Sequence, residues 1–125
     1  MSYKDHNVYQ VKGDSFSLVR NLPSKTSLLD VKDSVMLFRS ENPNLDVYTL
    51  VQGTKETQFT NIHSSLMAGV DEDGHVFYTD AVDNLIKSPN AILDKFIRGY
   101  VLYCDREFIY YCRSDRRSIG PDAHV

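Results

Sequence analysis

The sequence predicts an α+β domain in which an antiparallel sheet of hairpins packs against one or two short helices. Short runs rich in Val, Ile, Tyr and Thr alternate with turn signals through most of the 125 residues, which is typical of antiparallel strands. One later stretch, residues 80–98, carries helix-starting and helix-stopping residues instead. Strand content is therefore expected to exceed helix content.

Composition fits an ordinary globular protein, with 42% hydrophobic and 25% charged residues. We expect a single domain over residues 1–113, followed by a polar tail over residues 114–125 that is mobile or ordered only by contact. Apolar runs are only a few residues long, against the roughly 20 needed to span a membrane. The opening residues MSYKDHNVYQ lack the apolar stretch of a secretory signal, so a soluble cytoplasmic protein is expected.

The first hairpin is predicted from residues 7–11 and 15–20, two short strand-like runs on either side of Gly13 and Asp14. The stretch Asn-Leu-Pro-Ser that follows breaks the pattern. The next run, residues 27–39, is ambiguous because its apolar residues lie at helical spacing and its start fits a capping box.

A turn signal at residues 41–44 favours a second hairpin, with strands near 34–39 and 45–52 and a short helical turn before it. A further strand is expected at residues 57–62.

The clearest hairpin surrounds the acidic loop Asp71–Gly74, between strand-like runs at 65–70 and 75–79. An acidic loop that ends in Gly is typical of a type I turn followed by a left-handed residue. The loop also resembles part of a calcium site, but position twelve would be Val82 rather than a glutamate, and both flanks predict strands. We therefore predict a hairpin and no metal site.

Two short helices are expected after this hairpin. The first begins at a Thr79 or Asp80 cap and ends at Lys87. The second begins at Ser88, with proline in the first helical position, and ends before Gly99. Its apolar stripe comprises Ile92, Leu93, Phe96 and Ile97.

Two interpretations remain open for residues 100–112. A hairpin that turns at Asp105 and Arg106 places Tyr103 opposite Phe108, whereas a continuing helix aligns the apolar residues on one stripe. The preceding glycine and the content of Tyr, Val, Ile and Phe favour strands, although Asp-Arg is not a favoured turn pair. Whether this block is core or surface stays open at this level.

The C-terminal third also concentrates the residue types found at binding hot spots. Residues 100–117 hold four of the eight tyrosines, both cysteines and four arginines. Tyrosine and arginine combine a broad apolar contact with a directional polar end. The predicted partner-binding residues are Arg98, Tyr103, Arg106, Tyr110, Arg113, Arg116 and Arg117.

No catalytic, metal or cofactor motif is recognisable. Cys104 and Cys112 are too far apart for a disulfide as a hairpin or as a helix, and their spacing matches no common zinc pattern. The glycines form no phosphate-binding loop, and the histidines are scattered. We therefore expect no cofactor.

Three functions remain open. The favoured one is a non-enzymatic binding protein that modulates or inhibits a larger protein or complex through the Tyr/Arg surface. The second is binding of single-stranded nucleic acid, although residues 95–125 carry only 6 basic and 4 acidic groups, a weak positive excess. The third is a small enzyme whose site forms only in the fold, using His63 or Cys112.

Overall fold

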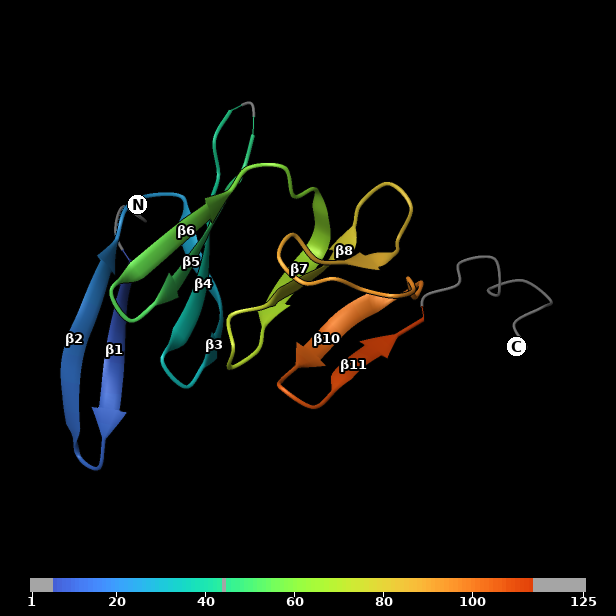
Figure 1. Cartoon of the computed structure of the whole chain (residues 1–125). Helices are drawn as coiled ribbons and strands as arrows, with labels where there is room; N and C mark the ends of the chain where they lie inside the picture. The colour runs from blue at the N-terminus through green and yellow to red at the C-terminus, as the bar shows by residue number, and fades with distance from the viewer. Residues whose placement is uncertain (1–5, 44, 114–125) are drawn as a thin grey trace.

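The computed structural model describes residues 6–43 and 45–113, and within them the chain forms eleven β-strands and no helix. The expected α+β class is therefore wrong, because the described fold is all-β (Figure 1). The strands are β1 His6–Lys12, β2 Ser15–Leu22, β3 Thr26–Lys32, β4 Val35–Ser40, β5 Val47–Gln52, β6 Lys55–Phe59, β7 Ser64–Val70, β8 Val76–Asp80, β9 Ile86–Lys87, β10 Tyr100–Cys104 and β11 Ile109–Cys112.

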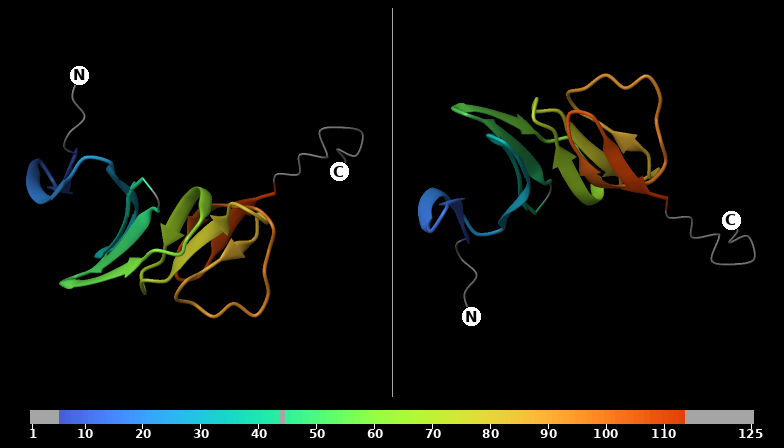
Figure 2. Two further views of the ribbon diagram at one scale, coloured as in Figure 1. Left: turned by 90° about the horizontal axis from the view of Figure 1, so that it is seen from above. Right: turned by 90° about the horizontal axis from the view of Figure 1, so that it is seen from below.

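The strands form four antiparallel sheets that follow one another along the chain. Their strand orders are β1-β2, β3-β4-β5-β6, β7-β8-β9 and β10-β11. The two larger sheets lie in the middle, and the two hairpins lie on opposite outer sides (Figure 2). Each outer hairpin therefore has one face toward the body and one face toward solvent.

Two apolar clusters hold the layers together, because successive residues of a strand point to opposite faces. One cluster fills the space between the two larger sheets. The other lies on the far face of β4 and β5, against the base of the β1–β2 hairpin. The first comprises Val35, Leu37, Tyr48, Leu50, Ile62, Ala68, Val70, Val76 and Tyr78, and the second comprises Leu22, Phe38 and Val51, with Val8, Leu28 and Met36 packed against it.

The predicted hairpins are confirmed where a turn residue marks them. Gly13 and Gly74 take the left-handed conformation, with φ of 57° and 87°, in the β1–β2 and β7–β8 turns. The β4–β5 hairpin is also present. The helical turn before it is wrong, because β3 pairs with β4 along its length and Asp33, with φ of 57°, reverses the chain.

The first predicted helix is wrong, although its cap forms. Asp80 Oδ1 accepts hydrogen bonds from the backbone N–H groups of Val82 and Asp83, as an N-cap would. Asn84 then turns into the left-handed region, with φ of 61°. Ile86 pairs with Thr79 in the sheet, so sheet pairing leaves a single turn of chain here and no helix.

The second predicted helix is also wrong, and again only its start forms. Ser88 Oγ accepts hydrogen bonds from the N–H groups of Asn90 and Ala91. The Asn90 side chain bonds to the Val76 N–H at the start of β8 and to the Gly74 carbonyl before it. The expected apolar stripe is not buried, since Ile92 is fully exposed. Residues 88–97 therefore form a loop whose ends are joined by a bond from Ile86 N–H to the Ile97 carbonyl.

Replacing Asn90 with alanine is expected to lower the free energy of unfolding by about 1–3 kcal/mol. Asn90 Oδ1 accepts from the N–H of the fully buried Val76 (2.9 Å), and Asn90 Nδ2 donates to the Gly74 carbonyl (2.8 Å). The alanine variant leaves the Val76 N–H without this acceptor. Urea denaturation of the variant and of Ala91→Ser, a change on the neighbouring residue, measures the difference. Equal midpoints would contradict the prediction.

Candidate partner-binding surface

The C-terminal block is a hairpin, as favoured, but its register differs from the predicted one. Tyr103 lies opposite Tyr110 rather than Phe108, and Cys104 lies opposite Ile109. The turn spans four residues because Asp105 Oδ1 accepts from the N–H groups of Glu107 and Phe108. The predicted two-residue turn at Asp105 and Arg106 is therefore wrong. The observed turn is longer, and the Asp105 carboxylate holds its backbone in place.

This hairpin contributes to both the core and the surface. Val101 and Cys104 are buried against the β7–β9 sheet. Four large side chains of the hairpin are 44–65% exposed, and two of them, Tyr103 and Tyr110, are paired across the strands. We call this set the aromatic face; it comprises Leu102, Tyr103, Phe108 and Tyr110.

Thr79 of β8 fixes the start of the hairpin. Its Oγ1 donates to the Gly99 carbonyl (2.8 Å) and accepts from the Val101 N–H (3.1 Å). Both bonds are buried, and Thr79 is 1% exposed. Because these bonds lie in a low-dielectric interior, they hold β10 firmly on the sheet. The aromatic face is therefore carried by an ordered scaffold.

Strand β3 adds two charged residues beside the aromatic face. Asp30 accepts from Lys32 Nζ at both carboxylate oxygens (2.9 and 2.8 Å), and Asp30 Oδ2 also accepts from the Val70 N–H (2.9 Å). Lys32 Nζ lies 4.6 Å from the centre of the Tyr103 ring, within cation–π range. The Tyr103 hydroxyl in turn donates to Asp105 Oδ2 (3.0 Å).

This network shifts the ionisation of its members. Burial alone lowers the pKa of Lys32, but its hydrogen bonds to Asp30 and the Asp30 charge outweigh burial and raise it. The hydrogen bond to Asp105, followed by burial, raises the pKa of Tyr103. Lys32 therefore stays charged and Tyr103 stays neutral at neutral pH.

The predicted arginines are distributed around the hairpin rather than gathered on the aromatic face. Arg106 pairs with Asp73 (3.1 Å) from the turn, and the Arg98 guanidinium donates to a backbone carbonyl. Arg113 is exposed at the end of β11. Arg116 and Arg117, like the expected tail 114–125, lie outside the described residues.

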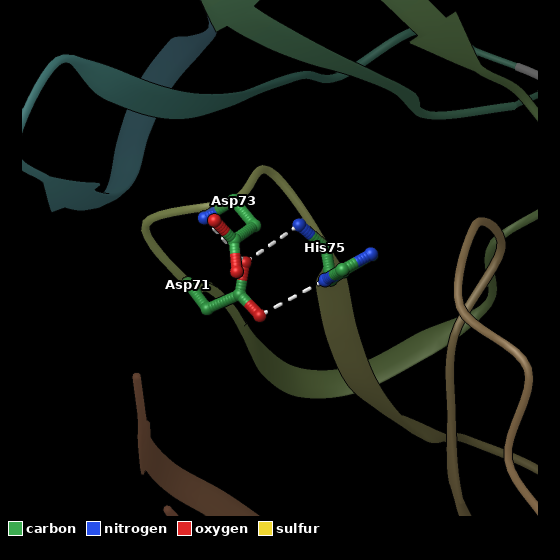
Figure 3. A group of neighbouring side chains, drawn as sticks. All are labelled: Asp71, Asp73 and His75. Carbon is green, nitrogen blue, oxygen red and sulfur yellow. Dashed lines mark hydrogen bonds and ion pairs between the residues drawn. The ribbon is translucent and has the colours of Figure 1, made fainter. Parts of the chain in front are cut away.

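The acidic loop brings Asp71, Asp73 and His75 together, with one ligand-type atom of each within 4.8 Å of the others (Figure 3). Asp71 Oδ1 accepts from the N–H groups of Asp73 and His75, and Asp71 Oδ2 lies 3.1 Å from His75 Nδ1. Asp73 is engaged with Arg106, which lowers the pKa of Asp73 through its hydrogen bonds. These carboxylates therefore serve to build the hairpin loop.

The residues named for a possible enzyme lie on different elements. His63 precedes β7, is exposed, and borders an open hollow of about 370 Å³ together with Asp46. Cys112 lies on β11 opposite Tyr100. The remaining cysteine, Cys104, is buried, and burial followed by the nearby Asp30 charge raises its pKa to about 12. A protonated thiol of this kind is unsuited to nucleophilic attack.

We expect native protein to react with Ellman's reagent at one thiol and denatured protein at two. Both cysteines are free; Cys112 is exposed, and Cys104 is fully buried with a raised pKa. Cys112→Ser is expected to abolish the native reaction, and Cys104→Ser is expected to leave it. Fast labelling of Cys104 in the folded protein would contradict its burial.

Comparison with known proteins supplies no relative. No protein-family model, curated protein or solved structure matches the chain. The part of the chain that the structure describes holds no helix long and apolar enough to cross a membrane.

Sequence reasoning located the hairpin but missed several members of the surface. Leu102 and Phe108 were absent from the predicted set because that set was chosen by residue type and held only tyrosines and arginines. Lys32 was missed because it comes from β3. Nothing in the local sequence of β10 and β11 pointed to β3.

Proposed function

We propose that the chain is a small, non-enzymatic, cytoplasmic binding protein that modulates or inhibits a larger protein by covering part of its surface. The contact surface is the aromatic face of β10–β11. The observation that carries the proposal is that a single hairpin holds four large side chains that are 44–65% exposed, with Tyr103 and Tyr110 paired across its strands. Aromatic anchors that lose water on contact supply most of the energy at protein interfaces.

The scaffold supports such a role because little conformational freedom remains to be lost on binding. Tyr103 is flanked by Lys32 and bonded to Asp105, and the hairpin is fixed through Thr79. Tyr103 and Tyr110 form a cross-strand pair. Side chains that are already ordered contribute more of their contact energy to affinity.

The charges around the face favour a protein partner over single-stranded nucleic acid. The turn beside Phe108 carries Asp105 and Glu107, and the neighbouring acidic loop carries Glu72, which accepts a bond from the Arg106 N–H. If the bases of a single strand stacked on the aromatic face, its phosphates would lie near these carboxylates and be repelled. Arg113 at the other end of the hairpin is suited to a carboxylate on the partner.

Affinity purification from native lysate, with and without nuclease, tests the proposal. The bait is the tagged wild type, the double variant Tyr103→Ser/Tyr110→Ser, or the control Phe96→Ser, which alters an aromatic that is 57% exposed outside the face. A stoichiometric protein that survives nuclease, is lost with the double variant and is kept with the control is expected. Circular dichroism confirms that each bait is folded.

Two outcomes would contradict the proposal. A partner retained by the double variant would place the contact elsewhere, and a partner removed by nuclease would favour nucleic acid. Changing Arg113, Arg116 and Arg117 to Glu tests separately whether the arginines contribute.

A further inference from the structure

A groove of about 370 Å³ lies between the β1–β2 hairpin, here called the arm, and the far face of the β3–β6 sheet. A bulge in β2, opposite the step from Val8 to Tyr9, adds Val19 to the arm side of the groove. Val19 and Val31 of β3 are 46% and 45% exposed, so the two walls leave apolar surface open between them. The apolar lining comprises Val8, Val19, Leu28, Val31 and Met36.

The inner end of the groove is closed by the base of the arm. Three of the lining side chains, Val8, Leu28 and Met36, also pack against the second apolar cluster, which holds the base on the sheet. Arg20 pairs with Glu56 of β6 (2.6 Å) and ties the base to the sheet as well. A molecule in the groove cannot continue past this base, which favours a small ligand with an apolar end over a chain that runs through.

Polar groups line the outer end of the groove. Asp33 and Ser34 form the β3–β4 turn, and Gly53 lies in the β5–β6 turn at the same end of the sheet, because Val35 pairs with Gln52. The Asp33 carboxylate forms no hydrogen bond or ion pair with a described residue. The groove therefore runs from an apolar inner end to an outer end that carries a free negative charge.

We propose that this groove binds a small amphipathic cation, a molecule with an apolar body and one amine. The body packs between the arm and the sheet, and the amine lies at the outer end beside Asp33. The groove volume falls within the range of about 300–1,000 Å³ that is typical of small-molecule sites, which are mostly apolar with few polar groups. Such a ligand also stabilises the arm, because a two-stranded ribbon is marginally stable alone in water.

The charges around the groove favour a cation over an anion. Asp33 is the single charged residue of the lining. Lys12 lies further along the arm, on the same side as Val8 and Gln10, and is not part of the lining. Phe16, on the other side of the arm, takes no part either. The aromatic face lies on the opposite outer hairpin, so this site is separate from the proposed partner contact (Figure 2).

Titration of the full chain with n-octylammonium, n-octanol and n-octanoate, at concentrations where none of them aggregates, tests the proposal. The three probes share one apolar chain and differ in the head group, and backbone amide shifts in ¹⁵N NMR spectra locate the site and give dissociation constants. Octylammonium is expected to shift the amides of the lining and to bind about two- to fivefold more tightly than octanol, with octanoate weakest. Hexylammonium is expected to bind about four- to fifteenfold more weakly than octylammonium, because two methylenes are lost from the groove.

Three variants separate the contributions. Asp33→Asn is expected to reduce octylammonium to the affinity of octanol, and asparagine tolerates the left-handed backbone at position 33, where φ is 57°. Val31→Lys is expected to weaken octylammonium at least tenfold, because it places a like charge in the lining. Val11→Lys is its matched control, since Val11 is 62% exposed on the other side of the arm, and it is expected to leave the affinity unchanged.

Several results would overturn the proposal. These are no saturable binding of octylammonium, octanoate binding as tight as that of octylammonium, an unchanged preference for octylammonium over octanol in Asp33→Asn, and equal effects of the two lysine substitutions. Shifts of the lining amides with protein concentration alone would also overturn it, because they would assign the groove to a second copy of the chain. Circular dichroism confirms that each variant is folded.

Discussion

Gly99→Ala is expected to lower the free energy of unfolding by about 3 kcal/mol or more, through backbone strain and overlap together. Gly99 has a φ of 155°, which side-chain-bearing residues rarely adopt. A Cβ at this position would lie 2.6 Å from Tyr111 Cδ2 and 2.8 Å from the Cys112 carbonyl oxygen. The carbonyl belongs to β11 and cannot rotate away, so the hairpin must move.

Gly53→Ala is the matched control for this change. Gly53 also has a positive φ, 64°, but nothing lies within 4 Å of the position its Cβ would occupy. Gly53→Ala therefore introduces backbone strain without a steric clash and is expected to lower the free energy of unfolding by about 1 kcal/mol. Thermal and urea unfolding of both variants measure the difference. Equal losses would show that the contact between Gly99 and β11 is not as described.

Gly99 also illustrates why local signals succeeded for turns and failed for helices. Sequence reasoning took this glycine as a helix stop, whereas the structure uses it for the close approach of β11. In the hairpin turn at Gly13 the requirement is local, because a positive φ reverses the chain and nothing lies within 4 Å of the position its Cβ would occupy. Turn residues therefore predicted hairpins well.

The helix predictions failed because residues that follow each N-cap bond to β8 instead of continuing a helix. The side chains of Asp80 and Ser88 do accept N–H groups in the cap geometry that the sequence indicates. The chain then leaves the helix because Ile86 pairs with Thr79 and Asn90 bonds to Val76. A short helix gains little on its own, so sheet pairing prevails.

The candidate surface was predictable as a segment but not as a face. Enrichment in tyrosine and arginine pointed to the segment that forms this hairpin, and Tyr103 and Tyr110 are exposed on it. The bulge at Leu102 and the four-residue turn set by Asp105 decide which side chains share a face. Neither is visible from alternation alone.

Asp30→Ala is expected to lower the free energy of unfolding by about 2–4 kcal/mol. The Asp30 carboxylate joins the two larger sheets, because it sits on β3 and accepts from the N–H of the fully buried Val70 on β7. The variant removes this acceptor and also removes the partner of Lys32, whose side chain is only 11% exposed. Each loss leaves a polar group with little access to water.

Two controls separate these causes. Asp73→Ala removes an ion pair in which both side chains are about half exposed, so it is expected to cost less than about 1 kcal/mol. Asp30→Asn keeps an oxygen for the Val70 N–H but lacks the charge, so the difference between Asn and Ala at position 30 reports the backbone bond. A loss at Asp30→Ala no larger than at Asp73→Ala would contradict the proposed link.

The pH dependence of the Asp30 variants should report Lys32 directly. Its pKa is raised in the folded protein, so its contribution to stability is complete below the unfolded value of about 10.4 and is lost as pH rises through the folded pKa. The gap in unfolding free energy between wild type and Asp30→Asn should therefore narrow in this alkaline range. The hydrogen bond to Asp105 raises the pKa of Tyr103, so ionisation of Tyr103 also lowers stability at alkaline pH. Both proteins retain Tyr103 and Asp105, so this loss is common to them and does not produce the change in the gap. A gap that stays constant through the alkaline range would show that Lys32 draws no stability from Asp30, leaving the Val70 bond alone to join β3 to β7.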